Sequence, residues 1–138
     1  MPTLTVDAQR TYEGESRENS HEVIASDVIY KGAAVGDNAN GYARPLQAGD
    51  PFYGFAIGKT NNLEGSAGDK RVHVYTKGRV HLDVAGVTSV GDVGEKVYAA
   101  DDATFTKTAT NNSLIGVIIR HLSGTACVVE FAAYGQVV

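Results

Sequence analysis

Apolar and polar side chains alternate without a slip from residue 71 to residue 84. The even positions are apolar apart from Thr76 and Gly78, whereas the odd positions are polar and mostly basic. A period of two predicts a β-strand with one face in the core and the other in solvent. A two-residue turn at Lys77 and Gly78 would mix the two faces, so we expect one long strand that bends at Gly78.

Shorter apolar segments, separated by Gly, Asp and Asn, predict the remaining strands. They cover residues 28–30, 42–44, 52–57, 97–99, 104–106, 114–119 and 125–131. The last two form a hairpin through residues 121–124, and the polar stretch 58–69 is typical of a surface loop. Segment 114–119 is apolar on both faces, which places it either in the centre of a sandwich or at a subunit contact.

These strands predict an all-β fold: a compact antiparallel β-barrel or sandwich head that spans residues 28–138. The total length of 138 residues fits a single domain of this kind. Residues 50–59 are similar to residues 112–120, and each copy follows a strand that carries a tyrosine. This similarity indicates two related β units, 28–84 and 92–131, that pack face to face.

The N-terminal part of the chain has a different composition. Residues 7–22 are polar and follow neither a helical nor a strand period, so we expect them not to fold alone. Residues 1–27 are therefore interpreted as an extended N-terminal arm, either a disordered tail or a segment that becomes ordered on a partner. Leu4 and Val6 on one face, and Tyr12 as an anchor, favour the second interpretation.

The net charge of −4 lies entirely in this segment. Residues 1–30 hold two basic and six acidic side chains, whereas the rest of the chain is neutral. The lack of a basic stripe argues against a nucleic-acid partner. No apolar run approaches the roughly 20 residues of a membrane helix, and the start of the sequence lacks a signal-peptide pattern, so we expect no membrane partner and synthesis in a cytoplasm.

The reactive side chains indicate no catalytic or metal site. A single cysteine, Cys127, excludes an internal disulfide and lies on the apolar side of its strand, where a buried position is expected. His73 and His81 would face each other in a hairpin, but this spacing does not match known zinc sites. Asp101 and Asp102 fit a turn better than a calcium loop. We expect no enzyme activity and no cofactor.

Three motifs in the second half of the chain resemble one known family. They are Gly-Asp-Val-Gly-Glu-Lys-Val-Tyr at 91–98, Thr-Lys-Thr-Ala at 106–109 and Asn-Ser-Leu-Ile-Gly-Val at 112–117. Their order, with Lys-Gly-Arg-Val upstream at 77–80, is similar to that of the small structural cement, or decoration, proteins of tailed-bacteriophage heads. The resemblance covers residues 28–134 in outline, and the acidic N-terminal segment departs from it because short family members lack such a segment.

The resemblance implies a structural virion protein that binds the outside of an expanded phage capsid and cements neighbouring capsomers. The implied partners are the major capsid protein and the chain itself, as a homotrimer, on the outer capsid surface. The alternative is a carbohydrate-binding or adhesin-like β module of a phage tail or cell-surface protein, although the absence of Trp weakens it. A third option, an enzyme with a metal at His73 and His81, has only that pair to support it.

Candidate contact residues with the capsid or a second subunit come from the N-terminal segment, from the polar face of the long strand and from the apolar strand near the C-terminus. They are Leu4, Val6, Tyr12, Glu13, Arg71, His73, Tyr75, Arg79, His81, Ile115 and Val117.

Overall fold

The computed structural model describes residues 3–133, and strands make up the regular structure of these residues apart from one 3₁₀ turn. The strands are β1 (Tyr12–Glu22), β2 (Asp27–Ile29), β3 (Ala34–Asp37), β4 (Ala43–Pro45), β5 (Phe52–Ala56), β6 (Thr60–Asn62), β7 (Arg71–Ala85), β8 (Lys96–Ala99), β9 (Phe105–Thr106), β10 (Ser113–Ser123) and β11 (Ala126–Ala132); the 3₁₀ turn η1 (Val90–Asp92) precedes β8. The all-β prediction is confirmed.

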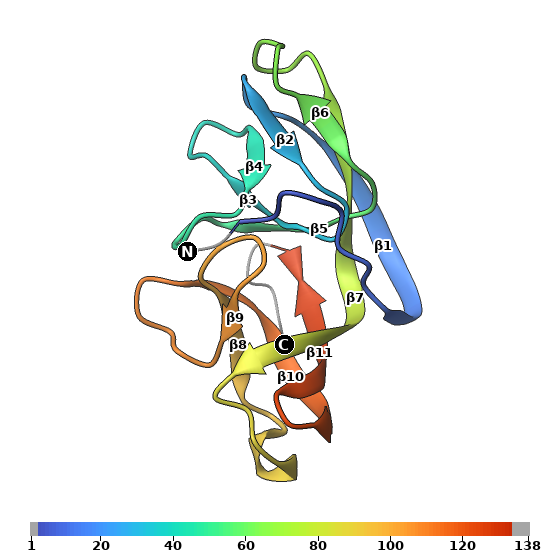
Figure 1. Cartoon of the computed structure of the whole chain (residues 1–138), viewed down its shortest axis with the longest axis vertical. Helices are drawn as coiled ribbons and strands as arrows, with labels where there is room; N and C mark the ends of the chain where they lie inside the picture. The colour runs from blue at the N-terminus through green and yellow to red at the C-terminus, as the bar shows by residue number, and fades with distance from the viewer. Residues whose placement is uncertain (1–2, 134–138) are drawn as a thin grey trace.

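Strand β7 is the continuous 15-residue strand that the alternation predicted. Its apolar side chains are buried from Val72 to Val84, whereas Arg71, Lys77 and Arg79 on the opposite face are exposed. The strand runs along the molecule and is paired on both edges over much of its length (Figure 1). Because the side-chain period is two, this single strand fixes which face of the sheet becomes core.

Five strands close into a β-barrel. Going around it, β7 pairs with β11, β11 with β10, β10 with β8 and β8 with β9, and β9 returns to β7 as a parallel neighbour. Its interior contains Phe55, Phe105, Ile115 and Phe131, and the Phe55 and Phe131 rings meet edge to face with centroids 4.9 Å apart. Such aromatic pairs add about 0.5–1.5 kcal/mol to the burial term.

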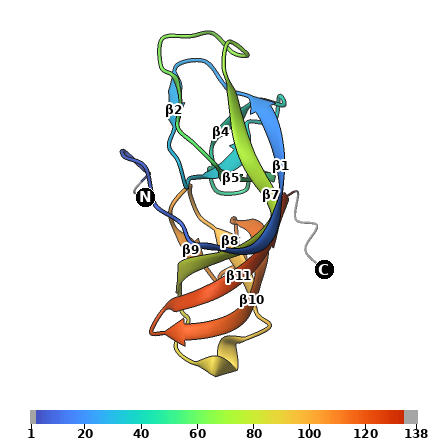
Figure 2. The same cartoon turned by 90° about the vertical axis from the view of Figure 1, so that its right-hand side faces the viewer.

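A second, smaller core lies outside the barrel, in the half of the molecule that holds β2 to β6 (Figures 1 and 2). Strand β5 separates the two cores: Phe52 and Phe55 belong to the barrel core, whereas Tyr53 and Ala56 belong to the second one. Gly54 allows this arrangement, because a Cβ there would overlap the Tyr75 carbonyl oxygen of the neighbouring strand. Its φ of +131° also disfavours other residues.

Residues 7–22 were interpreted as part of an arm that is disordered or becomes ordered on a partner, and this is wrong for residues 12–22. They form β1, which pairs antiparallel with β7 from Tyr12 opposite Val80 to Glu22 opposite Arg71 (Figure 2). Irregularities in register at residues 13–18 interrupt the strand, which explains why no simple period was visible in the sequence. From Tyr12 onward, the segment predicted to be an arm is therefore part of the same sheet as the head.

Two further expectations need correction. The polar stretch 58–69 contains β6, which pairs with β2 in a small two-stranded sheet. The division into units 28–84 and 92–131 also fails, because the barrel takes β7 from the first unit to close around strands of the second. The long strand β7 contributes side chains to both cores, so the two similar sequence segments do not form two separate packed units.

The C-terminal hairpin was predicted correctly, but its turn lies at residues 124–125 and not at 121–124, because β10 continues to Ser123. Strands β10 and β11 pair from Gly116 opposite Phe131 to Ser123 opposite Ala126. Cys127 is fully buried in the barrel, and burial raises the pKa of its thiol to about 11. Among residues 3–133, no helix is long and apolar enough to cross a bilayer.

Candidate interaction surface

The polar face of β7, flanked by β1 and β11, brings together several of the predicted contact residues. Glu13, Arg79 and Glu130 lie in one cross-strand row, since Glu13 is opposite Arg79 and Arg79 is opposite Glu130. The Arg79 Nε donates a hydrogen bond of 3.2 Å to Glu130. Both partners are well exposed, so this pair contributes at most about 1 kcal/mol.

Glu13 connects three strands that are far apart in sequence. Its carboxylate accepts hydrogen bonds from His81 Nε2 at 2.6 Å and from an Arg120 Nη at 2.7 Å. These bonds, that from Arg120 first, lower the pKa of Glu13 to about 2. His81 and Arg120 are both register partners of Val128, which is fully buried, so the carboxylate bridges over an apolar side chain. Glu13 was predicted to meet a partner, and here it binds its own barrel.

Tyr12 also packs against side chains of its own chain. Its ring lies 4.6 Å from that of Tyr75 and 6.3 Å from that of Phe131, measured between centroids. Its hydroxyl is buried and has no hydrogen-bond partner among the described residues, and burial raises the pKa of the phenol above its usual range. Tyr12 is indeed an anchor, but the surface it anchors to is the barrel of the same chain.

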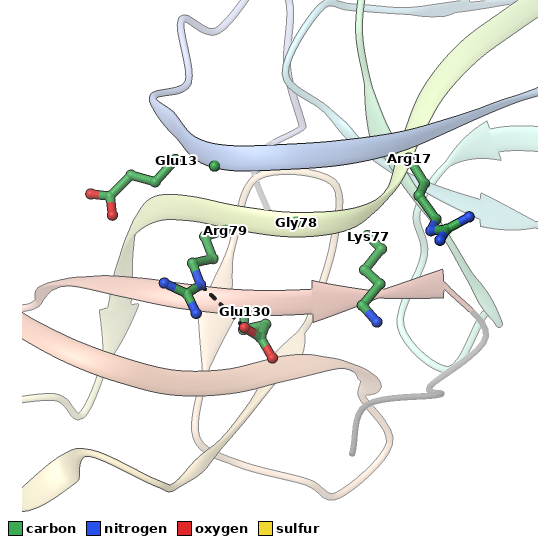
Figure 3. A pocket seen from close by; sticks show the side chains of 7 residues that line it. Glu13, Arg17, Lys77, Gly78, Arg79 and Glu130 are labelled. Carbon is green, nitrogen blue, oxygen red and sulfur yellow. Dashed lines mark hydrogen bonds and ion pairs between the residues drawn. The ribbon is translucent and has the colours of Figure 1, made fainter.

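A basic trough follows this row along β7. It has a volume of about 530 Å³. Its lining residues come from β1, β7 and β11 and are Glu13, Gly14, Arg17, Lys77, Gly78, Arg79 and Glu130 (Figure 3).

Among the side chains that the structure describes, the positive charge of the trough is only partly compensated. Arg17 and Lys77 are direct register partners, and like charges opposite each other destabilise a sheet. Both side chains are exposed, and among the side chains that the structure describes neither cation has an acidic partner. The two acidic residues of the trough are already engaged, Glu13 by His81 and Glu130 by Arg79. The trough is therefore suited to an acidic group from outside.

The other predicted contact residues are scattered. The Arg71 guanidinium binds the Ser20 hydroxyl and carbonyl, and His73 is exposed opposite Ser20. Because β7 is continuous, His73 and His81 do not face each other, and residues 3–133 contain no group of three His, Cys, Asp or Glu side chains that could hold a metal.

The apolar candidate contact residues differ in their exposure. Leu4 packs against the second core, whereas Val6 is 68% exposed. Ile115 was a candidate contact residue, and this is wrong because the side chain lies in the closed barrel with no exposed surface. Val117 is half-buried on the outer face of the barrel, opposite Glu130 on one side and Lys96 on the other.

No local pattern in the sequence indicates the Arg17–Lys77 pair or the role of Arg120, because each depends on a pairing between distant segments. No protein-family model matches this chain, and no curated protein matches it. The surface must therefore be interpreted from its own chemistry.

Proposed function

We propose that this chain is a capsid decoration protein that binds the outside of an expanded phage shell and cements neighbouring capsomers. The observation that carries the proposal is the basic trough, whose Arg17 and Lys77 lack acidic partners among the described side chains. The trough lies on paired strands, with β7 between β1 and β11. The motifs at 91–98 and 112–117, which resemble those of decoration proteins, give the proposal its specific class.

Attachment runs through this face of the barrel and not through a free arm. Strand β1 is paired with β7 and fixed by Tyr12 and Glu13, so little ordering entropy is lost when the face binds. Each copy contributes an interface of about 1,200–2,000 Å². Repetition over a closed lattice then retains the coat by effective concentration, even where one contact is weak.

The same packing weakens the carbohydrate-binding alternative. Sugar-binding β modules expose aromatic rings, whereas Tyr12 and Tyr75 pack on the barrel core and Tyr53 is buried in the second core. Half-buried apolar positions of β10, Val117 among them, remain on the outer face of the barrel and support association into the expected homotrimer.

The test is co-sedimentation with empty expanded shells, assembled from the major capsid protein of the phage that encodes this chain. Lys77→Glu should weaken binding at least about tenfold, because it reverses a charge in the trough and places a carboxylate beside Arg17. The same carboxylate removes a like-charge contact, so the variant should fold at least as well as the original. Lys70→Glu makes the same change of charge outside the trough and serves as the control.

Binding of the original protein should also fall with added salt, since exposed charges are screened within about 10 Å at 0.1 M. Equal binding by the Lys77→Glu and Lys70→Glu variants would refute the trough as the attachment surface. Binding to unexpanded and expanded shells alike would contradict the proposed role in stabilising the mature capsid.

A further inference from the structure

A second hollow, on another part of the molecule from the basic trough, has the opposite charge. We call it the acidic pocket. Its volume is about 600 Å³, within the range of ligand-binding pockets. It lies between the N-terminal segment, β2, the chain that follows β4, the end of β6 and the turn between β8 and β9, several of which converge on one side of the molecule in Figure 1. Its lining includes Leu4, Asp27, Val28, Leu46, Leu63 and Asp101.

The charged groups of this lining are all acidic. Asp27 and Asp101 are the two ionisable carboxylates, and no lysine, arginine or histidine lines the pocket. Asp101 is only 4% exposed. Its Oδ1 accepts the Ala103 N–H at 2.8 Å, but its Oδ2 is buried and has no hydrogen-bond partner among the described residues. A buried carboxylate oxygen without a partner is costly, and in native structures a water, an ion or a ligand usually completes it.

The next residue adds to the negative charge. Asp102 is 1% exposed, and both of its carboxylate oxygens lie 3.3 Å from the Leu4 backbone N–H, which donates to them. Burial, the largest cause, together with the charges of Asp101 and Asp27, raises the pKa of Asp102 to about 6 against the lowering effect of the Leu4 hydrogen bond. Arg10, which lies within electrostatic reach of Asp102, lines a different cavity. The three carboxylates therefore repel one another, and among residues 3–133 no lysine, arginine or histidine lines the pocket.

The rest of the wall determines what kind of cation fits. Most of the lining is apolar, including Leu4, Val28 and Leu46, and Leu63 is 56% exposed at the rim. A bare metal ion needs several oxygen ligands, and such walls do not supply them. An organic cation on an aliphatic stem satisfies both parts of the pocket, because the stem covers the apolar wall while the charged end reaches the carboxylates.

We propose that the acidic pocket binds the ammonium or guanidinium group of a lysine or arginine side chain presented by a partner protein. The exposed Leu63 at the rim provides apolar contact for the residues that flank such a side chain. The volume of about 600 Å³ leaves room for them as well. The net charge of −4 favours the approach of a basic surface. The proposal is independent of attachment through the basic trough.

The test is a titration of the full chain, followed by NMR shifts or calorimetry, with three probes. They are lysine blocked at both backbone ends, the same molecule acetylated at Nζ, and a blocked pentapeptide with a central lysine. Blocked lysine should bind at least about tenfold more tightly than its acetylated form, since acetylation removes the charge and leaves the stem. The pentapeptide should bind more tightly still.

Two variants locate the binding. Asp101→Asn keeps an oxygen for the Ala103 N–H and removes the unpaired charge, so it should fold and should abolish the preference for the charged probe. Ala48→Trp fills an exposed part of the lining and should block all three probes without a change in charge. Asp83→Asn removes an exposed carboxylate of β7 outside the pocket and should leave binding unchanged.

Equal binding of the charged and acetylated probes would overturn the proposal, as would full binding by the folded Asp101→Asn variant. A pentapeptide that binds no more tightly than blocked lysine would overturn the assignment to a partner protein.

Discussion

Replacing Tyr12 tests whether the packing of β1 against the barrel contributes to the stability of the fold. Full removal of a buried aromatic side chain costs about 3–5 kcal/mol, and Tyr12 is only partly buried, so we expect Tyr12→Ala to cost about 2–3 kcal/mol. The edge-to-face contact with Tyr75 accounts for about 0.5–1.5 kcal/mol of this. For a domain of this size the melting temperature should fall by roughly 6–12 °C.

The matched variant is Tyr12→Phe. It keeps the ring contacts with Tyr75 and Phe131 and removes a hydroxyl that is buried with no partner among the described residues. Its unfolding free energy should therefore change by less than about 1 kcal/mol, in the stabilising direction. Urea and thermal unfolding followed by circular dichroism measure both variants, with an unchanged m-value as the check that the unfolded state is comparable.

A Tyr12→Ala variant as stable as the original protein would refute this reasoning. It would mean that β1 detaches from the barrel without cost, as the interpretation of residues 1–27 as an arm requires. A Tyr12→Phe variant that loses as much stability as Tyr12→Ala would instead show that the hydroxyl has a partner in solution.

The remaining predictions concern pH, reactivity, backbone geometry and assembly. The pKa of Asp102 is about 3.8 in the unfolded chain and is raised to about 6 in the fold. Protonation of Asp102 therefore stabilises the fold fully below pH 3.8, and this contribution is lost as pH rises through 6. Asp102→Asn should stabilise the protein in denaturant titrations at pH 8 and have little effect at pH 4. Cys127 should react with thiol reagents slowly in the native protein and quickly in urea, and Cys127→Val should change stability by less than about 1.5 kcal/mol; rapid native labelling would contradict its burial. Gly54→Ala should cost at least about 2 kcal/mol, whereas Gly58→Ala, with open space around its Cβ position, should be nearly neutral in the same assay. Sedimentation at micromolar concentration should give a homotrimer, and a monomer there would exclude the proposed assembly.

Local periodicity determined much of the fold. The alternation in residues 71–84 is a property of neighbouring residues, and it correctly gave the core face of β7, the continuity of that strand and the exposure of Arg71 and Arg79. The hairpin of β10 and β11 and the burial of Cys127 followed for the same reason. When one face of a strand is in the core and the other is in solvent, the alternation of its own residues shows which face is buried.

Strand β1 is the case in which this reasoning failed. Its residues are polar on both faces and interrupted by irregularities in register, so the sequence resembles that of an unfolded segment. β1 is held by its pairing with the edge of β7, by the contact of Tyr12 with the Tyr75 ring, and by the hydrogen bonds that Glu13 accepts from His81 and Arg120. These partners lie some 60 to 110 residues away in the chain, and a local pattern carries no record of them.

The two candidate binding regions show the same limit. Asp101 and Asp102 were correctly placed in a turn, because turn chemistry is local. Their burial beside Leu4 depends on where the N-terminal segment crosses the barrel. In the same way, Arg17 and Lys77 became a pair of like charges only when β1 took its register on β7. The sequence by itself determined the orientation of β7, the C-terminal hairpin and the turn at Asp101 and Asp102. The tertiary structure decided that β1 and β6 are strands and which charges meet, because strand pairing and electrostatic contact both depend on distance in space.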